Sequence, residues 1–301
     1  MKRIGVIPVI TIDVNGVSFR LKEYQNFDWL KTLGKVFCVF DEQDSGNLSF
    51  GIQEGRNKLF VKYAGAKTMD YSGNPEDAVE RLKRAIPVYQ DLKHPSLINL
   101  VNHFEVGNGY AGVFEWFDGE CLHPHWSFPP PQKYTHPDSP YFRFRQLPVD
   151  LRLTSLDAIF QFHVHVEAMD CVAIDFYDGS ILYDFSTNST RICDIDLYAK
   201  KPFINNMGRL WGSSRFMSPE EFEMGAVIDE QTNVFNMGAT AFVLFGGESD
   251  RSLSKWEASE ALYEVALRAV DEGRTKRFSS VAEFYHAWRE ARYRNVIQKS
   301  L

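Results

Sequence analysis

Short hydrophobic runs separated by polar segments fill the first third of the chain and predict β-strands. Three runs, rich in β-branched and aromatic residues and separated by the turn-forming segments DEQDSG and QEGR, lie at 35–40, 47–52 and 58–65. They predict a meander of three antiparallel strands. Two further strands are expected around 98–106 and 109–117.

A helical pattern separates the third and fourth of these strands. The segment 74–92 opens with Asn74 as the helix cap and Pro75 at the first helical position, and its apolar residues recur at helical spacing. Because Pro87 lacks an amide hydrogen, we expect this helix to end or kink near that residue. Helical patterns return in the second half of the chain, near 154–169, 230–245, 254–271 and 280–292.

Two segments fall outside this succession of strands and helices. An Asn-Gly pair at 15–16 interrupts an apolar run near the N-terminus and predicts a β-hairpin. The segment 123–148 is too rich in proline for a regular element. It could cover part of a cleft or dock a partner, but the simpler expectation is a tolerated surface loop.

Composition narrows the classes of function. A chain of 301 residues with 44% hydrophobic and 14% aromatic content can bury a large core, split into two lobes or domains. The net charge of -7 gives no basic face, so neither nucleic acid nor a membrane is expected as a partner. Four cysteines without CxxC spacing argue against zinc and favour the reducing cytoplasm. The N-terminal apolar run is interrupted at Asp13, too early for a signal peptide or membrane span.

The order of these elements resembles that of protein kinases, in particular bacterial members of the serine/threonine kinase group. The resemblance runs from about Leu33 to about Trp288, and the order and spacing of its motifs make it specific. It implies an α+β fold of two lobes, a small antiparallel β-sheet lobe with one helix and a larger, mainly helical lobe. The implied division is an N-terminal extension at 1–24, a small lobe at 25–117 that ends in the hinge, and a large lobe at 118–301.

Two motifs of the small lobe carry the resemblance. LFVKYAG is similar to the third kinase strand, whose lysine holds the α and β phosphates of ATP, and Lys62 takes that place. GVFEWFDGECL is similar to the segment that leads into the kinase hinge. There the resemblance makes Phe114 the gatekeeper, and the backbones of Glu115 and Phe117 would hydrogen-bond adenine.

Three motifs of the large lobe follow in the family's order. AIDFYDGSIL resembles the catalytic loop HRDLKPENIL, which puts Asp175 on the catalytic base and Ser180 on the metal-binding asparagine. RICDIDLYAK resembles the DFG segment, with Asp194 on the aspartate that holds Mg²⁺. GSSRFMSPE resembles the end of the activation segment, and the resemblance implies a structural ion pair between Glu220 and Arg277. ATP and Mg²⁺ are the implied cofactors.

The small lobe departs from the family pattern at two places. The loop 41–47 has three acids and Gly46 alone where kinases place a Gly-rich phosphate cover, so either the loop stays open or Gly46 alone brings backbone amides close. The helix glutamate that pairs with the strand lysine falls at Ala85. Glu80 is the nearest acid, on a different part of the helix face, and is a weak candidate to reach Lys62.

The large lobe departs at further positions. Ser180 for asparagine keeps an oxygen but shortens a metal ligand, and Tyr177 replaces the lysine that neutralises the transferring phosphate. Asn233 stands where kinases usually carry aspartate. Ile174 replaces the arginine that reads a phosphorylated activation loop, and 195–212 contains no Ser or Thr. We therefore expect a constitutive geometry without loop phosphorylation.

Three functions from different classes remain open. The first is an ATP-dependent kinase that moves the γ-phosphate to the hydroxyl of an unidentified protein or small molecule, with Asp175 as base and Asp194 on Mg²⁺. The second is a pseudokinase, a nucleotide-binding or scaffold module. The third is a small-molecule kinase. Retention of Lys62, Asp175 and Asp194 favours the first, the departures favour the second, and the SPE motif disfavours the third.

Overall fold

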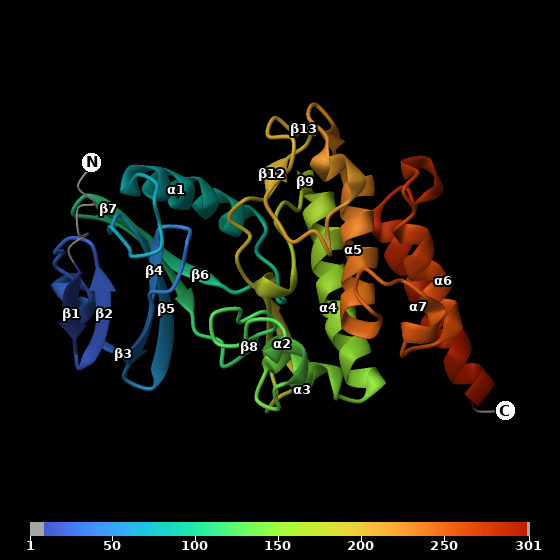
Figure 1. Ribbon diagram of the computed structural model, residues 1–301, viewed down its shortest axis with the longest axis horizontal. Coiled ribbons are helices and arrows are strands. Elements are labelled where there is room, and N and C mark those ends of the chain that lie inside the picture. Colours follow the sequence, from blue (N-terminus) through green and yellow to red (C-terminus); the bar gives the residue numbers. More distant parts are fainter. Residues whose placement is uncertain (1–8, 300–301) are drawn as a thin grey trace, which may run out of the picture. The chain divides into compact units, whose positions relative to one another are not determined.

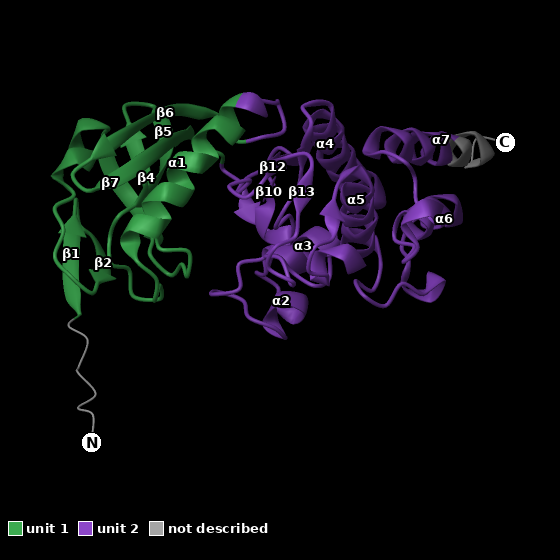
Figure 2. Ribbon diagram, turned by 90° about the horizontal axis from the view of Figure 1, so that it is seen from above, with its two compact units in different colours: residues 1–90, 98–117 green, residues 91–97, 118–301 purple. Residues whose placement is uncertain are grey.

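The chain forms two compact units in the computed structural model, which describes residues 9–299. Unit 1 consists of residues 1–90 and 98–117, and unit 2 of residues 91–97 and 118–301 (Figure 2). Residues 1–8 of the expected N-terminal extension and residues 300–301 of the expected large lobe lie outside the described residues.

Unit 1 is built on a five-stranded antiparallel sheet with strand order β3-β4-β5-β7-β6 (Figure 1). The short hydrophobic runs form these strands, as predicted. Their bounds are β3 Lys35–Phe40, β4 Asn47–Glu54, β5 Asn57–Ala64, β6 Leu100–Val106 and β7 Gly109–Glu115.

One long helix, α1 (Pro75–Asp91), packs against this sheet. A Cβ added to Gly112 on β7 would meet Ile86 of α1 at 3.4 Å, so the helix lies on the face to which residue 112 points. The helix predicted over 74–92 is confirmed, but of the two alternatives at Pro87, an end or a kink, the end is wrong because α1 continues to Asp91. Pro87 is exposed on the outer side of the helix, whereas Ile86 and Tyr89 beside it are buried and hold the helix on the sheet.

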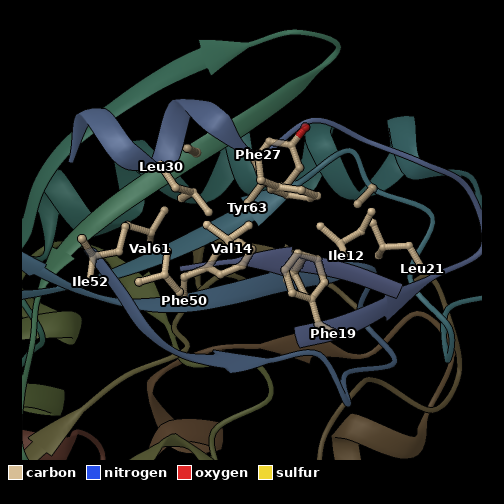
Figure 3. Packing of buried hydrophobic residues seen from close by; sticks show 14 of the residues in the cluster. Ile12, Val14, Phe19, Leu21, Phe27, Leu30, Phe50, Ile52, Val61 and Tyr63 are labelled. Atoms are coloured by element: carbon tan, nitrogen blue, oxygen red, sulfur yellow. The ribbon is translucent and has the colours of Figure 1, made fainter. Parts of the chain in front are cut away.

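The predicted N-terminal hairpin is confirmed and belongs to the core of unit 1. Strands β1 (Ile10–Val14) and β2 (Val17–Leu21) pair around Asn15 and Gly16, whose positive φ angles of 58° and 85° suit the turn that an Asn-Gly pair favours. The 3₁₀ helix η1 (Asp28–Thr32) follows the hairpin. Figure 3 shows side chains of the hairpin and of the sheet meeting in one hydrophobic cluster, among them Val14, Phe19, Phe50 and Val61.

Unit 2 is mainly helical. Helix α5 is the most deeply buried of its long helices, because from Thr232 to Phe245 all of its residues are buried. Ser259 caps α6, so the helix expected at 254–271 is shorter than its sequence pattern. The long helices are α4 Val149–Ala168, α5 Glu230–Phe245, α6 Glu260–Ala269 and α7 Val281–Lys299, and the 3₁₀ helices are η2 Asp178–Ser180, η3 Pro219–Phe222, η4 Leu253–Lys255 and η5 Arg274–Lys276.

Short antiparallel sheets complete unit 2. Strand β10 pairs with both β11 and β8, β9 pairs with β12, and β13 pairs with β14. Their bounds are β8 Glu120–Cys121, β9 Cys171–Val172, β10 Ile181–Asp184, β11 Ser189–Ile192, β12 Ala199–Lys200, β13 Phe203–Ile204 and β14 Val227–Ile228. The fold of the chain is therefore of the α+β class. Within residues 9–299, no helix combines the length and the apolar character that crossing a bilayer requires.

The expectation of a surface loop at 123–148 holds only in part: most residues of 125–138 are exposed, but the segment also forms two short helices and is anchored in unit 2. It contains helices α2 (Gln132–Thr135) and α3 (Pro140–Arg145), and Pro140 starts α3 immediately after the cap residue Ser139. The Tyr141 hydroxyl donates to the carbonyl of Val243 at 2.7 Å, and the buried Phe144 ring lies 5.0 Å from that of Tyr183. The segment is thus anchored by its buried aromatic side chains.

Candidate functional site

The predicted site residues belong to both units. Unit 1 carries Gly46, Lys62, Phe114, Glu115 and Phe117, and unit 2 carries Asp175, Ser180 and Asp194.

Lys62 lies in the middle of the unit 1 sheet. It is paired across the strands with Ser49 on β4 and with Gly112 on β7, and its side chain is buried. Because paired residues point to the same face, Lys62 shares the face that α1 covers. The opposite face carries Val61 and Tyr63, which belong to the hydrophobic cluster with the hairpin. A buried ammonium on this face suits a negatively charged ligand.

The acidic side chain considered as a partner for Lys62 points elsewhere. Glu80 is 71% exposed and forms an ion pair with Arg84 at 3.4 Å on the outer surface of α1. Ala85, at the position where kinases carry glutamate, is fully buried. Helix α1 therefore presents methyl groups rather than a carboxylate at that position.

The loop at 41–47 is held against α1. The Arg81 guanidinium donates to the carbonyl oxygen of Ser45 at 2.5 Å and lies 5.4 Å from the centre of the Tyr71 ring. Gly46 has a φ of 78°, and a Cβ there would come within 2.6 Å of the Tyr71 ring, so only glycine fits beside it. The glycine that the resemblance singles out therefore has a steric reason in unit 1 itself.

Aromatic side chains also lie on the Lys62 face. Phe60, two residues before Lys62 on the same strand, lies 6.3 Å from the predicted gatekeeper Phe114, which is buried and also contacts Tyr89 at 4.9 Å between ring centres. The Glu115 amide donates to the carbonyl of Asn99 at 2.9 Å, so that amide is engaged within unit 1 and would not serve adenine. The predicted adenine contact at Glu115 therefore depends on its carbonyl oxygen.

In unit 2, the loop that contains Asp175 is anchored by α5. The buried Asn233 side chain accepts a hydrogen bond from the Ala173 amide at 2.9 Å. Asp175 and Asp194 both adopt positive φ angles, 65° and 53°. Such left-handed conformations are uncommon outside glycine and collect at functional sites, where the surrounding fold must hold them.

The charges of Asp175 and Asp194 both contribute to the raised pKa values of the same two tyrosines. Burial raises the pKa of Tyr177, and the charges of Asp194 and Asp175 raise it further. Burial also raises the pKa of Tyr198 well above its ordinary value, with contributions from Asp175, Cys193 and Asp194. Asp175 and Asp194 are therefore brought into one region of unit 2, and the neighbour at position 177 is a neutral phenol, where the resemblance expects a lysine.

Ser180 and Asp194 offer oxygen ligands that suit Mg²⁺. The Ser180 hydroxyl is buried and has no hydrogen-bond partner among the described residues, while its carbonyl accepts from the Cys193 amide at 2.9 Å, next to Asp194. Mg²⁺ commonly binds one or two carboxylates and completes its shell with phosphate oxygens and water. Across residues 9–299, no group of three or more His, Cys, Asp or Glu side chains is arranged to hold a metal.

Asp178, three residues after Asp175, is the centre of a buried ion network that the sequence reasoning missed. Arg215 binds it with two hydrogen bonds, Nη2 to Oδ1 at 2.8 Å and Nη1 to Oδ2 at 3.0 Å. Lys133 of α2 donates to the same carboxylate, and Glu248 accepts from Arg215 at 2.9 Å. Burial by itself would raise the pKa of Asp178, but Arg215 and Lys133 hold it below its ordinary value. The sequence offered one sign of this network: Asp178 stands in AIDFYDGSIL where the kinase motif HRDLKPENIL has proline.

The structural ion pair predicted between Glu220 and Arg277 is confirmed. Arg277 donates Nη1 to Oε1 at 2.7 Å and Nη2 to Oε2 at 3.2 Å, and both residues are buried. The Thr232 hydroxyl also donates to Glu220 at 3.0 Å. The pair joins the 213–222 segment to the residues that precede α7.

Comparison with known proteins includes a partial match to a kinase. No protein-family model matches the chain. Serine/threonine-protein kinase 36 of Pongo abelii is 28% identical over 78 residues, which is 26% of this chain and 6% of that protein. The chain is thus similar, over about a quarter of its length, to part of a much longer serine/threonine protein kinase.

Proposed function

We propose that this protein is a divergent, two-lobed phosphotransferase of the protein-kinase type, which moves the γ-phosphate of ATP to a hydroxyl group of a protein or small molecule. The observation that carries the proposal is that Asp175 and Asp194, in the order and spacing of the kinase motifs, are both held in left-handed conformations. The Glu220–Arg277 pair and the partial match to a kinase support it.

The two carboxylates would have separate tasks. Asp175 would orient the acceptor hydroxyl and take its proton. Asp194 and Ser180 would hold Mg²⁺, which neutralises phosphate charge when bound. Lys62 would bind the α and β phosphates as a point charge. Tyr177 supplies no positive charge to the transferred phosphate, so we expect the transfer to be slow.

A pseudokinase that binds nucleotide or acts as a scaffold is the second candidate. It is favoured by Ala85 at the family's glutamate position, by the exposed Glu80–Arg84 pair and by the neutral Tyr177. A small-molecule kinase is less well supported, because the Glu220–Arg277 pair follows the protein-kinase pattern.

The four cysteines are free thiols, which favours the cytoplasm as the compartment.

Calorimetric titration of ATP into the full chain tests the proposal. With Mg²⁺ present we expect saturable binding, and Asp194→Asn should weaken it by at least about tenfold because an amide is a poorer Mg²⁺ ligand than a carboxylate. Asp138→Asn, which changes an 84% exposed carboxylate of the same unit, is the matched control and should leave binding unchanged. Absence of binding at millimolar nucleotide, or binding indifferent to Mg²⁺ and to Asp194, would contradict the proposal.

A further inference from the structure

We propose that Asp178 and Arg215 are positioning residues, a permanent ion pair that holds the 213–220 segment against the 173–180 loop without any phosphorylation. The inference rests on the proposed function for its catalytic consequence, since Asp175 lies within the loop that the pair anchors. The structural part of the inference concerns unit 2 alone.

The pair joins two segments that also meet at a second point. Gly212, three residues before Arg215, lies so close to the loop that a Cβ added to it would be 3.6 Å from the Cα of Asp175. The loop therefore meets this part of the chain at two points, Asp175 beside Gly212, which precedes the segment, and Asp178 at Arg215 within it. Because the guanidinium and the carboxylate meet through two parallel hydrogen bonds, the pair fixes orientation as well as distance.

Each charge in the network has more than one partner. Asp178 is bound by Arg215 and by Lys133, whose side chain is 1% exposed. Arg215 in turn binds Glu248, and the Tyr134 hydroxyl donates to Glu248 at 3.1 Å, while the Tyr141 hydroxyl, which donates to Val243, lies 3.2 Å from it. Two acids thus balance two bases, and because Asp178 and Lys133 are fully buried, the arrangement is costly to open and suits a contact that is always formed.

In this contact the positive and negative groups lie on the opposite segments from those in a phosphorylation switch. In such a switch an arginine on the catalytic loop binds a phosphate on the activation segment. Here the loop supplies the anion, Asp178, and the segment supplies the cation, Arg215. Ile174, at the position of the switch arginine, is buried in a hydrophobic cluster with Met217 and Leu210. The segment is therefore tethered by apolar contacts and by a fixed charge.

The rest of the 213–220 segment is bound to α5, so Arg215 is placed by a rigid support. The Asn236 side chain donates to the carbonyl of Phe216 and to Glu221, both at 2.9 Å. Ser218 donates its hydroxyl to Glu221 at 2.9 Å. With one end of the segment held in this way, the Asp178–Arg215 pair transmits that rigidity to the loop that carries Asp175.

Hydrogen exchange of the full chain tests the pair directly. In Arg215→Met, where Lys133 still neutralises Asp178, we expect amides of 173–182 and 210–218 to exchange at least about tenfold faster, while those of α6 stay unchanged. Arg143→Met, which removes an ion pair with Glu120 whose members are 37% and 46% exposed, is the control and should leave both segments protected. Arg215→Lys keeps the positive charge but cannot make the two parallel hydrogen bonds of a guanidinium, so its amides should exchange at an intermediate rate.

Two exchange results would overturn the structural part of the inference: unchanged exchange in both segments of Arg215→Met, or faster exchange spread evenly over unit 2. Phosphotransfer kinetics separate this inference from the proposed function. We expect Arg215→Met to lower kcat by about tenfold or more with the Kd for MgATP changed less than about twofold, and phosphatase treatment to leave wild-type kcat unchanged. A wild-type protein without transfer, but with the expected exchange pattern, would refute the proposed function and leave the ion pair's role intact. Transfer that persists at the wild-type rate in Arg215→Met would refute the positioning role alone.

Discussion

The Glu220 carboxylate and the Arg277 guanidinium meet in a buried two-point ion pair, although 57 residues separate them in the chain. Breaking a buried pair leaves one charge without compensation, so we expect Glu220→Gln to lower the free energy of unfolding by about 3–5 kcal/mol. Urea denaturation followed by tryptophan fluorescence measures the change. Arg84→Gln, which breaks the exposed pair with Glu80, is the control and should change stability by less than about 0.5 kcal/mol. Equal effects of the two variants would contradict the assignment of a structural role to the buried pair.

The N-terminal hairpin should contribute strongly to the stability of unit 1. Phe19 is 2% exposed, and its ring makes edge contacts with Phe27 and Phe50 at 5.2 Å and 5.5 Å. We expect Phe19→Ala to destabilise the protein by about 3–5 kcal/mol through lost burial and a cavity. Tyr24→Ala, at a side chain that is 71% exposed, should have little effect in the same denaturation experiment. An unchanged free energy of unfolding in Phe19→Ala would mean that the hairpin does not contribute to the stability of unit 1.

Glu221 should make stability depend on pH. Burial raises the pKa of this carboxyl to about 7 from its ordinary value of 4.5, despite hydrogen bonds from Ser218 and Asn236. Because the folded pKa is the higher one, the stabilising contribution is present below pH 4.5 and is lost as the pH rises from 4.5 through about 7.

Glu221→Gln should remove this loss, since the amide does not ionise. We expect the stability of the variant relative to wild type to increase by on the order of 3 kcal/mol between about pH 4.5 and pH 8. Urea denaturation of both proteins at the two pH values measures it. A difference between variant and wild type that stays constant with pH would show that Glu221 does not titrate in this range.

Tyr177 should limit the rate of phosphotransfer. Its neutral phenol lies near Asp175 and Asp194, at the position where the resemblance expects a lysine. A cation there would stabilise charge on the transferred phosphate, so we expect Tyr177→Lys to raise kcat by about tenfold at saturating MgATP. Tyr177→Phe keeps the ring without the hydroxyl and should leave kcat within about twofold. Formation of ADP measures both rates, and a faster Tyr177→Phe together with an unchanged Tyr177→Lys would refute this explanation.

The strands and long helices were predictable because their signals are local. Short runs of β-branched and aromatic residues defined the five strands of the large sheet in unit 1, and the Asn-Gly pair defined the hairpin turn. The fold of 123–148 was not predictable in this way, because Tyr141 is anchored by Val243, 102 residues away. Pro87 misled for a similar reason, since packing of Ile86 and Tyr89 on the sheet outweighs the lost hydrogen bond.

Among the site residues, too, those that depend on contacts between distant parts of the chain were the hardest to predict. The Glu220–Arg277 pair could be predicted because the resemblance supplied both partners. Asp178 and Arg215 are 37 residues apart, and no local pattern relates an acid in one motif to a base in another. The exposure of Glu80 likewise depends on how α1 rotates against the sheet, which sequence spacing alone specifies too loosely.

Formation of ADP and phosphorylated product from MgATP by wild type and Asp175→Asn is the most direct test of the central claim. The variant keeps the size of the side chain but cannot accept the proton of the acceptor hydroxyl. We predict slow, Mg²⁺-dependent turnover by wild type, a fall of about 100-fold or more in Asp175→Asn, and an MgATP affinity changed by less than about twofold. Tight MgATP binding without turnover in wild type, or equal turnover in both proteins, would contradict phosphotransfer from Asp175 as base.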